Sequence, residues 1–275
     1  MATTNPIGGV FWRMVAAELR KLLSRPSGVV MLVISALLPI LVFGLAKLVE
    51  GGGVNMNANG QPVASLFSLD GPKLLGYMLT ARNFFVLPLF LVMVSAQLVA
   101  EERANFTLRA LLALPNARWR VLLAKYTALL TLAAISIAGS LGVGGPLCFL
   151  FVDGPQTLVA WQGVALGWVA SLASDAGLIA LTLLISTFSS SVAGVLVGVI
   201  LGLMADLAIR GLLQIAGMLK LFPTDQLAAL MPGRALAAWE GYADGWDPWA
   251  FLGLGLLTLG CLAVATFRFQ REDVL

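Results

Sequence analysis

The sequence contains no histidine, few charged residues and only two cysteines among its 275 residues. Without histidine, the chain has no imidazole for acid–base catalysis, metal ligation or a proton relay. Its charged fraction of 11% is less than half of the roughly 25% found in soluble domains. Cys148 and Cys261 lie in separate apolar stretches whose flanks do not favour a disulfide. Basic residues flank apolar runs instead of forming an aromatic-interleaved patch, which argues against nucleic-acid binding.

Apolar residues are abundant: they make up 59% of the chain, and the mean hydropathy is +0.93. A helix needs about 20 apolar residues to cross a membrane. The apolar runs fall at 28–49, 77–100, 121–145, 157–186, 192–213 and 248–267. They predict an all-α integral membrane protein with six spans, in which residues 1–275 form a single transmembrane domain. The first run is longer than a signal-peptide core, so we expect a retained helix.

The orientation follows from the distribution of lysine and arginine, which concentrate on the cytoplasmic side of a membrane. If the N-terminus is cytoplasmic, 11 of the 17 basic residues lie inside: Arg13, Arg20, Lys21, Arg25, Arg103, Arg109, Arg118, Arg120, Lys125, Arg268 and Arg271. The pattern predicts a multi-pass protein of the cytoplasmic (inner) membrane with both termini cytoplasmic.

Two further segments are not expected to cross the membrane. Residues 10–24 carry apolar side chains at a spacing of three to four, at Phe11, Val15, Leu19 and Leu22. This spacing predicts an amphipathic helix that lies in the interface and ends before Pro26. Residues 214–247 combine prolines, tryptophans and acidic residues, a mixture typical of lumenal interfacial or re-entrant helices.

The segment between the second and third spans is the most informative for function. Asn105 or Thr107 can cap a short helix there, four leucines supply an apolar side, and Pro115 ends it. The pattern predicts a short helix over 103–117 at the cytoplasmic surface. On residues alone two interpretations stay open: a rigid link that offers side chains to a cytoplasmic partner, or a surface connector.

The motifs of this segment resemble those of a known family. The acids Glu101 and Glu102 precede Arg-x-x-x-Thr-Leu-Arg-x-Leu-Leu-x-Leu-Pro, from Arg103 to Pro115, and a basic restart follows. This arrangement resembles the coupling-helix region of permease subunits of ABC-2 type transporters. Residues 17–26 resemble the elbow helix of those permeases, the lumenal segment their re-entrant helices, and residues 267–274 their common ending. The residues that the resemblance assigns to ATPase coupling are Glu101, Glu102, Arg103, Thr107, Arg109, Pro115 and Arg118.

The resemblance implies a permease subunit that moves a substrate outward. It implies a second permease copy or sibling and two copies of a cytoplasmic ATP-binding cassette ATPase, which holds the ATP and Mg. No cofactor or metal is expected in this chain, and none of its five lysines is followed by the Ser or Thr of a phosphate-binding loop. We therefore expect it not to be an enzyme itself.

Two rival functions remain. The first is a non-transporting membrane anchor that passes ATPase-driven movement to an envelope complex; a polar route through the bundle argues against it, and a dry glycine-packed seam argues for it. The second is a secondary transporter, which predicts repeats between the two halves of the chain. The loop pattern and charge of the halves differ, so the sequence does not favour this rival.

The fourth and fifth predicted spans carry small residues at every fourth position, followed by charged residues. The small residues expected to serve dimer or helix packing are Gly163, Gly167, Gly194, Gly198 and Gly202. The intramembrane polar residues are Asp175, Asp206 and Arg210. A charge near mid-membrane costs at least ~2.5 kcal/mol unless it is paired or hydrated. Two interpretations stay open: the aspartates line a polar path, or Arg210 pairs with Asp206 or Asp175 and locks the spans together. Arg82 and Asn83 are expected at the lumenal interface, with the arginine snorkelling.

Overall fold

The computed structural model describes residues 6–50, 57–58, 61–62, 70–84, 86–104, 118–151, 158–189, 191–218, 225–241 and 245–271. The helices in chain order are α1 (Pro6–Ser24), α2 (Pro26–Glu50), α4 (Gly71–Phe84), α5 (Val86–Ala96), the π-helix η1 (Gln97–Glu101), α6 (Glu102–Ala104), α8 (Arg118–Phe151), α9 (Leu158–Ser186), α10 (Val192–Met218), α11 (Asp225–Leu230), α12 (Pro232–Leu236), the 3-10 helix η2 (Ala238–Glu240) and α14 (Pro248–Arg271). The strands β1 (Asn57–Ala58) and β2 (Gln61–Pro62) form a small antiparallel pair.

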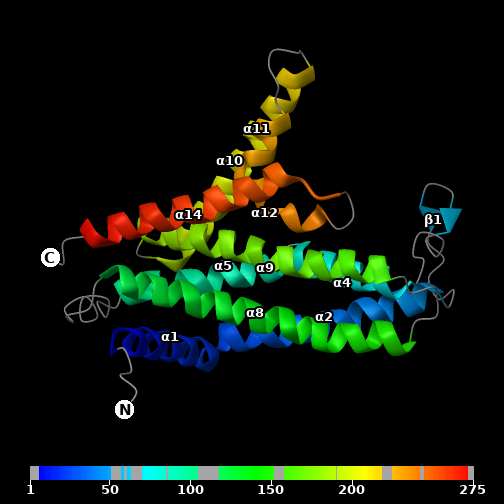
Figure 1. The fold of residues 1–275 in the computed structure, drawn as a ribbon, viewed down its shortest axis with the longest axis horizontal. Coiled ribbons are helices and arrows are strands. Elements are labelled where there is room, and N and C mark those ends of the chain that lie inside the picture. Colours follow the sequence, from blue (N-terminus) through cyan, green and yellow to red (C-terminus); the bar gives the residue numbers. More distant parts are fainter. Residues whose placement is uncertain are drawn as a thin grey trace.

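The expected all-helical membrane fold is confirmed. Among the described residues, five helices are long and apolar enough to cross a membrane, and the number is six if α4 and the following helix form one bent span. The long helices lie side by side, and α1 and the C-terminal end of α14 are found at the same end of the bundle (Figure 1). Helix α2 packs on α8, and α9 packs on α14.

The second span is broken, where the apolar pattern predicted one run over 77–100. Gly71–Phe84 and Leu87–Ala100 meet at an angle of 41°. Proline has no N–H to donate, and its ring clashes with the carbonyl group four residues earlier. Helix α4 ends at Phe84, four residues before Pro88. Pro88 therefore explains the break, and the helix begins at Gly71, earlier than predicted.

Helix α1 ends at Ser24 and α2 begins at Pro26, as the proline requires. The apolar side of α1 packs against protein: Val15 and Leu22 are buried, and Phe11 and Leu19 pack against the same core. Helix α1 also contacts α8. The side that we expected to lie in the membrane interface is therefore largely used to attach α1 to the bundle, whereas Trp12 on another side is 62% exposed.

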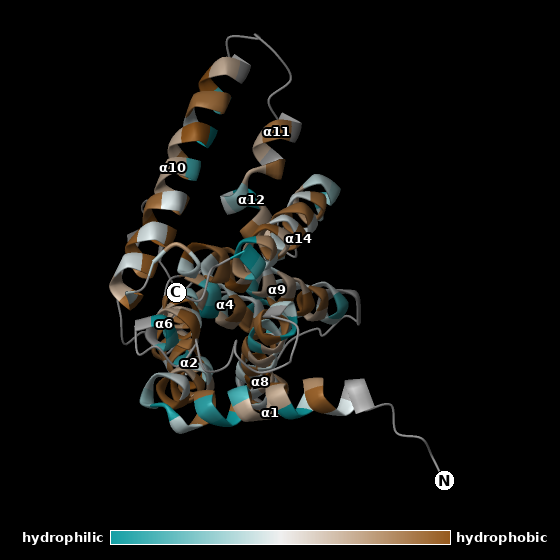
Figure 2. Ribbon diagram, turned by 90° about the vertical axis from the view of Figure 1, so that its left-hand side faces the viewer, coloured by the Kyte–Doolittle hydropathy of each residue, from teal (hydrophilic) through white to brown (hydrophobic). Residues whose placement is uncertain are grey.

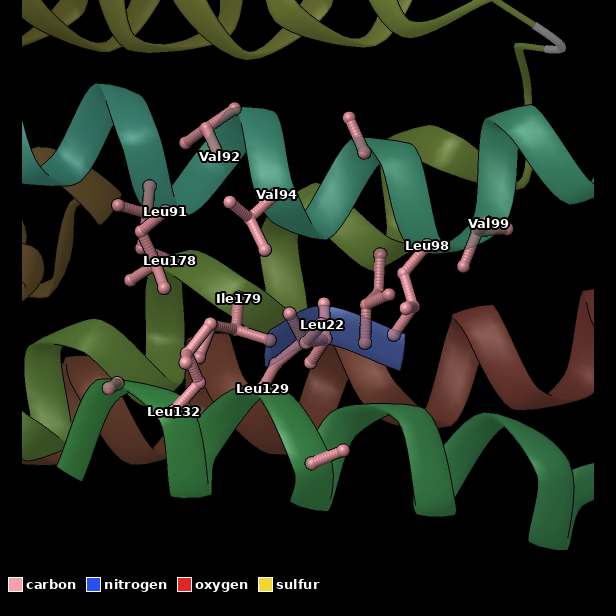
Figure 3. Close-up of a cluster of buried hydrophobic side chains, with 14 of the residues drawn as sticks. Leu22, Leu91, Val92, Val94, Leu98, Val99, Leu129, Leu132, Leu178 and Ile179 are labelled. Atoms are coloured by element: carbon pink, nitrogen blue, oxygen red, sulfur yellow. The ribbon is translucent and has the colours of Figure 1, made fainter. Parts of the chain in front are cut away.

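The main core lies between α1, α5, α8 and α9, where branched aliphatic side chains interdigitate (Figure 3). Its labelled members include Leu22, Leu91, Val94, Leu98, Leu129, Leu132, Leu178 and Ile179. Lipid tails are as apolar as leucine, so helix contacts in a membrane depend on close packing and on polar contacts. The described chain has such polar contacts at one end of the bundle and at several positions within it.

Helix α10 diverges from the bundle, with α11 beside its far end (Figures 1 and 2). Its outer side is strongly apolar, and Leu201 and Leu212 are 62% and 67% exposed. In the predicted interfacial or re-entrant segment 214–247, α10 continues to Met218, and α11, α12 and η2 follow. These short helices return the chain to α14.

Candidate functional site

The second span ends in a π-helical turn, η1, which directly precedes Glu102. A π-helical turn takes in one residue more than an α-helical turn, so the side chains after it are rotated by about one residue step, ~100°. Glu102 is only 3% exposed. Of the adjacent acids Glu101 and Glu102, the second is therefore the one for which the structure gives a buried position.

Glu102 belongs to a network of four charged side chains from three helices. Lys125 of α8 is fully buried, and its Nζ lies 2.7 Å from Glu102 Oε2 and 2.8 Å from Glu18 Oε1 of α1. The same ammonium group donates to the carbonyl oxygen of Leu98 at 3.2 Å. Lys21 of α1 also pairs with Glu102. Two carboxylates and two ammonium groups thus join α1, α6 and α8, and we call this set the charge network.

The environment of Glu102 acts on its pKa in two opposing directions. Burial opposes ionisation and raises the pKa. The charge of Lys125, its hydrogen bond, and the contacts with Lys21 favour the carboxylate. Together they outweigh burial and hold the pKa of Glu102 below its ordinary value of 4.5. Glu102 is therefore an anion at neutral pH.

Next to the charge network, two arginines converge on the turn between α9 and α10. The carbonyl oxygen of Thr187 accepts from Arg103 Nη1 at 2.9 Å and from Arg268 Nε at 3.1 Å. The Arg268 guanidinium also lies over the Phe188 ring, 3.7 Å from its centroid. Arg103 follows the second span and Arg268 lies near the end of α14. Three segments far apart in the sequence are thus joined at one carbonyl group.

Four of the residues predicted for ATPase coupling lie in the described part of the chain, at this end of the bundle. Glu102 and Arg103 make the contacts above, Glu101 ends η1, and Arg118 begins α8. Most of the predicted coupling helix 103–117, including Thr107, Arg109 and Pro115, lies outside the described residues. The sequence prediction missed Glu18, Lys21 and Lys125 as partners. One signal was available: a lysine inside the long apolar run of α8 needs a counter-ion.

In the middle of the bundle, Arg82 of α4 pairs with Asp175 of α9. Arg82 Nη2 lies 2.7 Å from Asp175 Oδ2, and their side chains are 2% and 8% exposed. Arg82 Nη1 also donates to Asn83 Oδ1 at 2.6 Å and to Ser171 Oγ at 2.8 Å. The expectation that Arg82 snorkels at the interface is wrong, since its guanidinium points into the bundle and neutralises Asp175.

Asp206 and Arg210 form an ion pair within α10, with Arg210 Nε 2.8 Å from Asp206 Oδ2. Their i,i+4 spacing allows this contact. Gly233 of α12 packs on the pair: a Cβ atom there would overlap the Asp206 carboxylate and lie 2.7 Å from Arg210 Nη2. The pair therefore holds the short α12 segment against α10, and only glycine fits without displacement.

The five predicted packing glycines have different surroundings. An added Cβ at Gly198 would lie 2.9 Å from Ile185 of α9, which marks a close helix contact. At Gly194 it would meet the side chains of the preceding turn, whereas at Gly163 and Gly202 nothing of the described chain lies within 4 Å. Gly167 is buried. Gly202 thus lies on a side of α10 that has no neighbour within the described part of the chain.

A cavity of about 400 Å³ is lined by residues of α4, α5, α9, α10, α12 and η2. Asp175 and Arg210, one member of each mid-bundle ion pair, both line it. Thr80, Asn83, Ser174 and Glu240 add further polar groups, while leucine, valine and isoleucine side chains line the rest. The cavity therefore has a polar part and an apolar part.

The fold and these contacts define a polytopic helical membrane protein in which one end of the bundle is cross-linked by buried charges. Comparison with protein families matches the chain over residues 12–274 to the family described as ABC-2 family transporter protein. The chain belongs to this family, as its motifs predicted, and is a membrane component of a transporter. Among curated proteins, none matches the chain.

Proposed function

We propose that this chain is the permease subunit of an ATP-driven transporter that moves a substrate outward, with ATP and Mg bound and ATP hydrolysed on a partner. Membership of the ABC-2 family supports a separate ATPase, because such permeases generally work with one. The chain itself has no Gly-x-x-x-x-Gly-Lys-Ser/Thr segment to hold the phosphates of ATP.

The observation that carries this proposal is the charge network. Glu102 and Arg103 stand where the predicted coupling segment 103–117 begins in the sequence, and these two residues contact α1, α8 and the α9–α10 turn. A displacement of this segment by an ATPase would then act on three parts of the bundle together. Buried charge pairs resist separation, because moving one partner away leaves the other charge buried without compensation. The network thus transmits displacement as a rigid joint.

In this proposal the charge network faces the cytoplasm and both termini lie on that side of the cytoplasmic membrane. The excess of lysine and arginine at this end supports the orientation. The apolar outer side of α10 and the open position at Gly202 support a second permease copy or sibling there. Each copy would bind one ATPase subunit, two in the complex, and α5 and α10 would rearrange at the seam.

The alternative of a non-transporting anchor uses the same charge network. A polar route through the bundle argues against it, and a cavity with ionic and hydroxyl groups lies between α4, α9 and α10. This cavity favours transport. We therefore retain the transporter as the proposed function.

Co-purification tests the partner directly. The tagged chain is co-expressed with the ATPase encoded beside its gene, and the subunits recovered in the complex are counted. We expect one ATPase per permease chain, and we expect Arg109→Glu to lose it because this change reverses a charge of the predicted coupling helix. Lys73→Glu is the matched control, since Lys73 is exposed and pairs with Asp70 at the other end of the second span. Equal recovery with both variants would remove the basis of the proposal.

A further inference from the structure

The cavity between α4, α5, α9 and α10 has an opening toward the membrane. Phe84 and Leu89 line it from the second span and are 83% and 36% exposed; Ile200 lines it from α10 and is 46% exposed. All three are large and apolar, so the opening faces lipid tails and not water. A molecule that enters by this route must first dissolve in the bilayer.

The deep part of the cavity carries polar groups with unused hydrogen-bonding capacity. Ser174 is 6% exposed, and within the described chain its Oγ has no hydrogen-bond partner. Asn83 Nδ2 also has no hydrogen-bond partner within the described chain, whereas Asn83 Oδ1 accepts from Arg82 and Ser171. Buried polar atoms are nearly always hydrogen-bonded in folded proteins. These two groups fit the oxygen atoms of a bound molecule.

The charged residues around the cavity balance one another. Asp175 pairs with Arg82 at 2.7 Å, and Arg210 pairs with Asp206 at 2.8 Å. Glu240 lies 3.5 Å from Arg234. Each charged residue that lines the cavity therefore has a partner of opposite sign, and no free charge is left to neutralise an ionic ligand. A head group with a net charge would be desolvated there without compensation.

We propose that this cavity binds a single-chain amphiphile from the bilayer, with its alkyl chain between α5 and α10 and an oxygen-bearing head of no net charge at Ser174 and Asn83. The volume of about 400 Å³ is at the lower end of ligand sites, which suits one chain and a small head. The inference deepens the proposed function by naming a substrate class. The polar groups favour this occupant over a second copy of the chain, whose apolar α10 would leave them without partners.

Photolabelling of the full chain in phosphatidylcholine vesicles, without ATPase or ATP, tests the site. The probe is a monoacylglycerol with a diazirine in its acyl chain; lysophosphatidic acid with the same chain is the charged comparison. We expect the uncharged probe to label Leu89–Val92 and Leu196–Leu203 saturably, and the anionic probe to label them weakly. Since Leu203 lines the cavity, Leu203→Trp should weaken labelling at least ~tenfold, the equivalent of about 1.4 kcal/mol. Leu201→Trp, two residues away and 62% exposed, is the matched control and should label as the unmodified chain does.

Ser174→Ala is a second variant that removes one hydroxyl group without filling space. It should raise the half-saturating probe concentration about two- to tenfold, the effect of one neutral hydrogen bond. The inference is overturned if the extent of labelling is unchanged in Leu203→Trp and Ser174→Ala, or if the anionic probe labels the chain equally. The inference is also overturned if the probe does not label the chain and the Leu203→Cys variant forms a disulfide between two copies, since a second copy then covers the cavity. Because no ATPase is present, a failure here is separate from a failure of ATPase co-purification.

Discussion

Replacing Lys125 by methionine should destabilise the protein strongly, because it unbalances the charge network. The network holds two positive and two negative side chains, and Lys125 is its only fully buried member. In Lys125→Met the carboxylates of Glu18 and Glu102 share the single ammonium group of Lys21. Breaking a buried ion pair by removing one partner costs about 3–5 kcal/mol. We expect a loss of this size.

The double variant Glu102→Leu/Lys125→Met provides the decisive comparison. It removes one charge of each sign, so that Glu18 and Lys21 remain and the network is again neutral. Replacing both partners of a buried pair by apolar groups is close to neutral. In equilibrium unfolding of the purified chain, we expect the double variant to regain most of the stability that Lys125→Met loses. If the stability losses of the single variants Glu102→Leu and Lys125→Met simply add in the double variant, Glu102 and Lys125 do not interact, and the reasoning is refuted.

Three further predictions concern pH, α12 and the mid-bundle pair. Because its folded-state pKa is lowered, Glu102 contributes stability above pH 4.5 that is lost as pH falls through the lower folded value. Lys125→Met removes contacts that lower this pKa, so the loss of stability on acidification should be smaller in the variant, as unfolding between pH 3 and 7 can show. Gly233→Ala should cost about 1–3 kcal/mol, because its Cβ overlaps the ion pair of α10, whereas Gly255→Ala, with open space around its Cβ, should leave the thermal midpoint unchanged. Arg82→Leu alone should cost about 3–5 kcal/mol, and Arg82→Leu/Asp175→Leu should recover most of it; additive melting-point losses would contradict the pairing.

Local features of the fold followed from the sequence, whereas contacts between distant segments did not. Long apolar runs predicted the crossing helices because length and hydropathy are properties of one segment. Asp206 and Arg210 are four residues apart on one helix, so spacing was enough to suggest their contact. Arg82 and Asp175 are 93 residues apart. Their pairing depends on how α4 packs on α9, which no local pattern contains.

One departure had a signal that a stricter application of backbone chemistry would have used. Pro88 inside the second apolar run was a reason to expect a break near Phe84. The burial of Glu102 had no such signal, because it follows the π-helical turn η1, and neither residue type nor hydropathy identifies such a turn. The buried acid was therefore beyond the reach of the sequence.

The proposed coupling role of the charge network has one most direct test. The complex with the ATPase is reconstituted with the unmodified chain and with Glu102→Leu/Lys125→Met, which should fold normally, and the stimulation of ATP hydrolysis is measured per recovered complex. We predict that the double variant recovers the ATPase but loses its stimulation, because α1, α6 and α8 no longer move as one joint. Unchanged stimulation in a fully recovered complex would contradict the account.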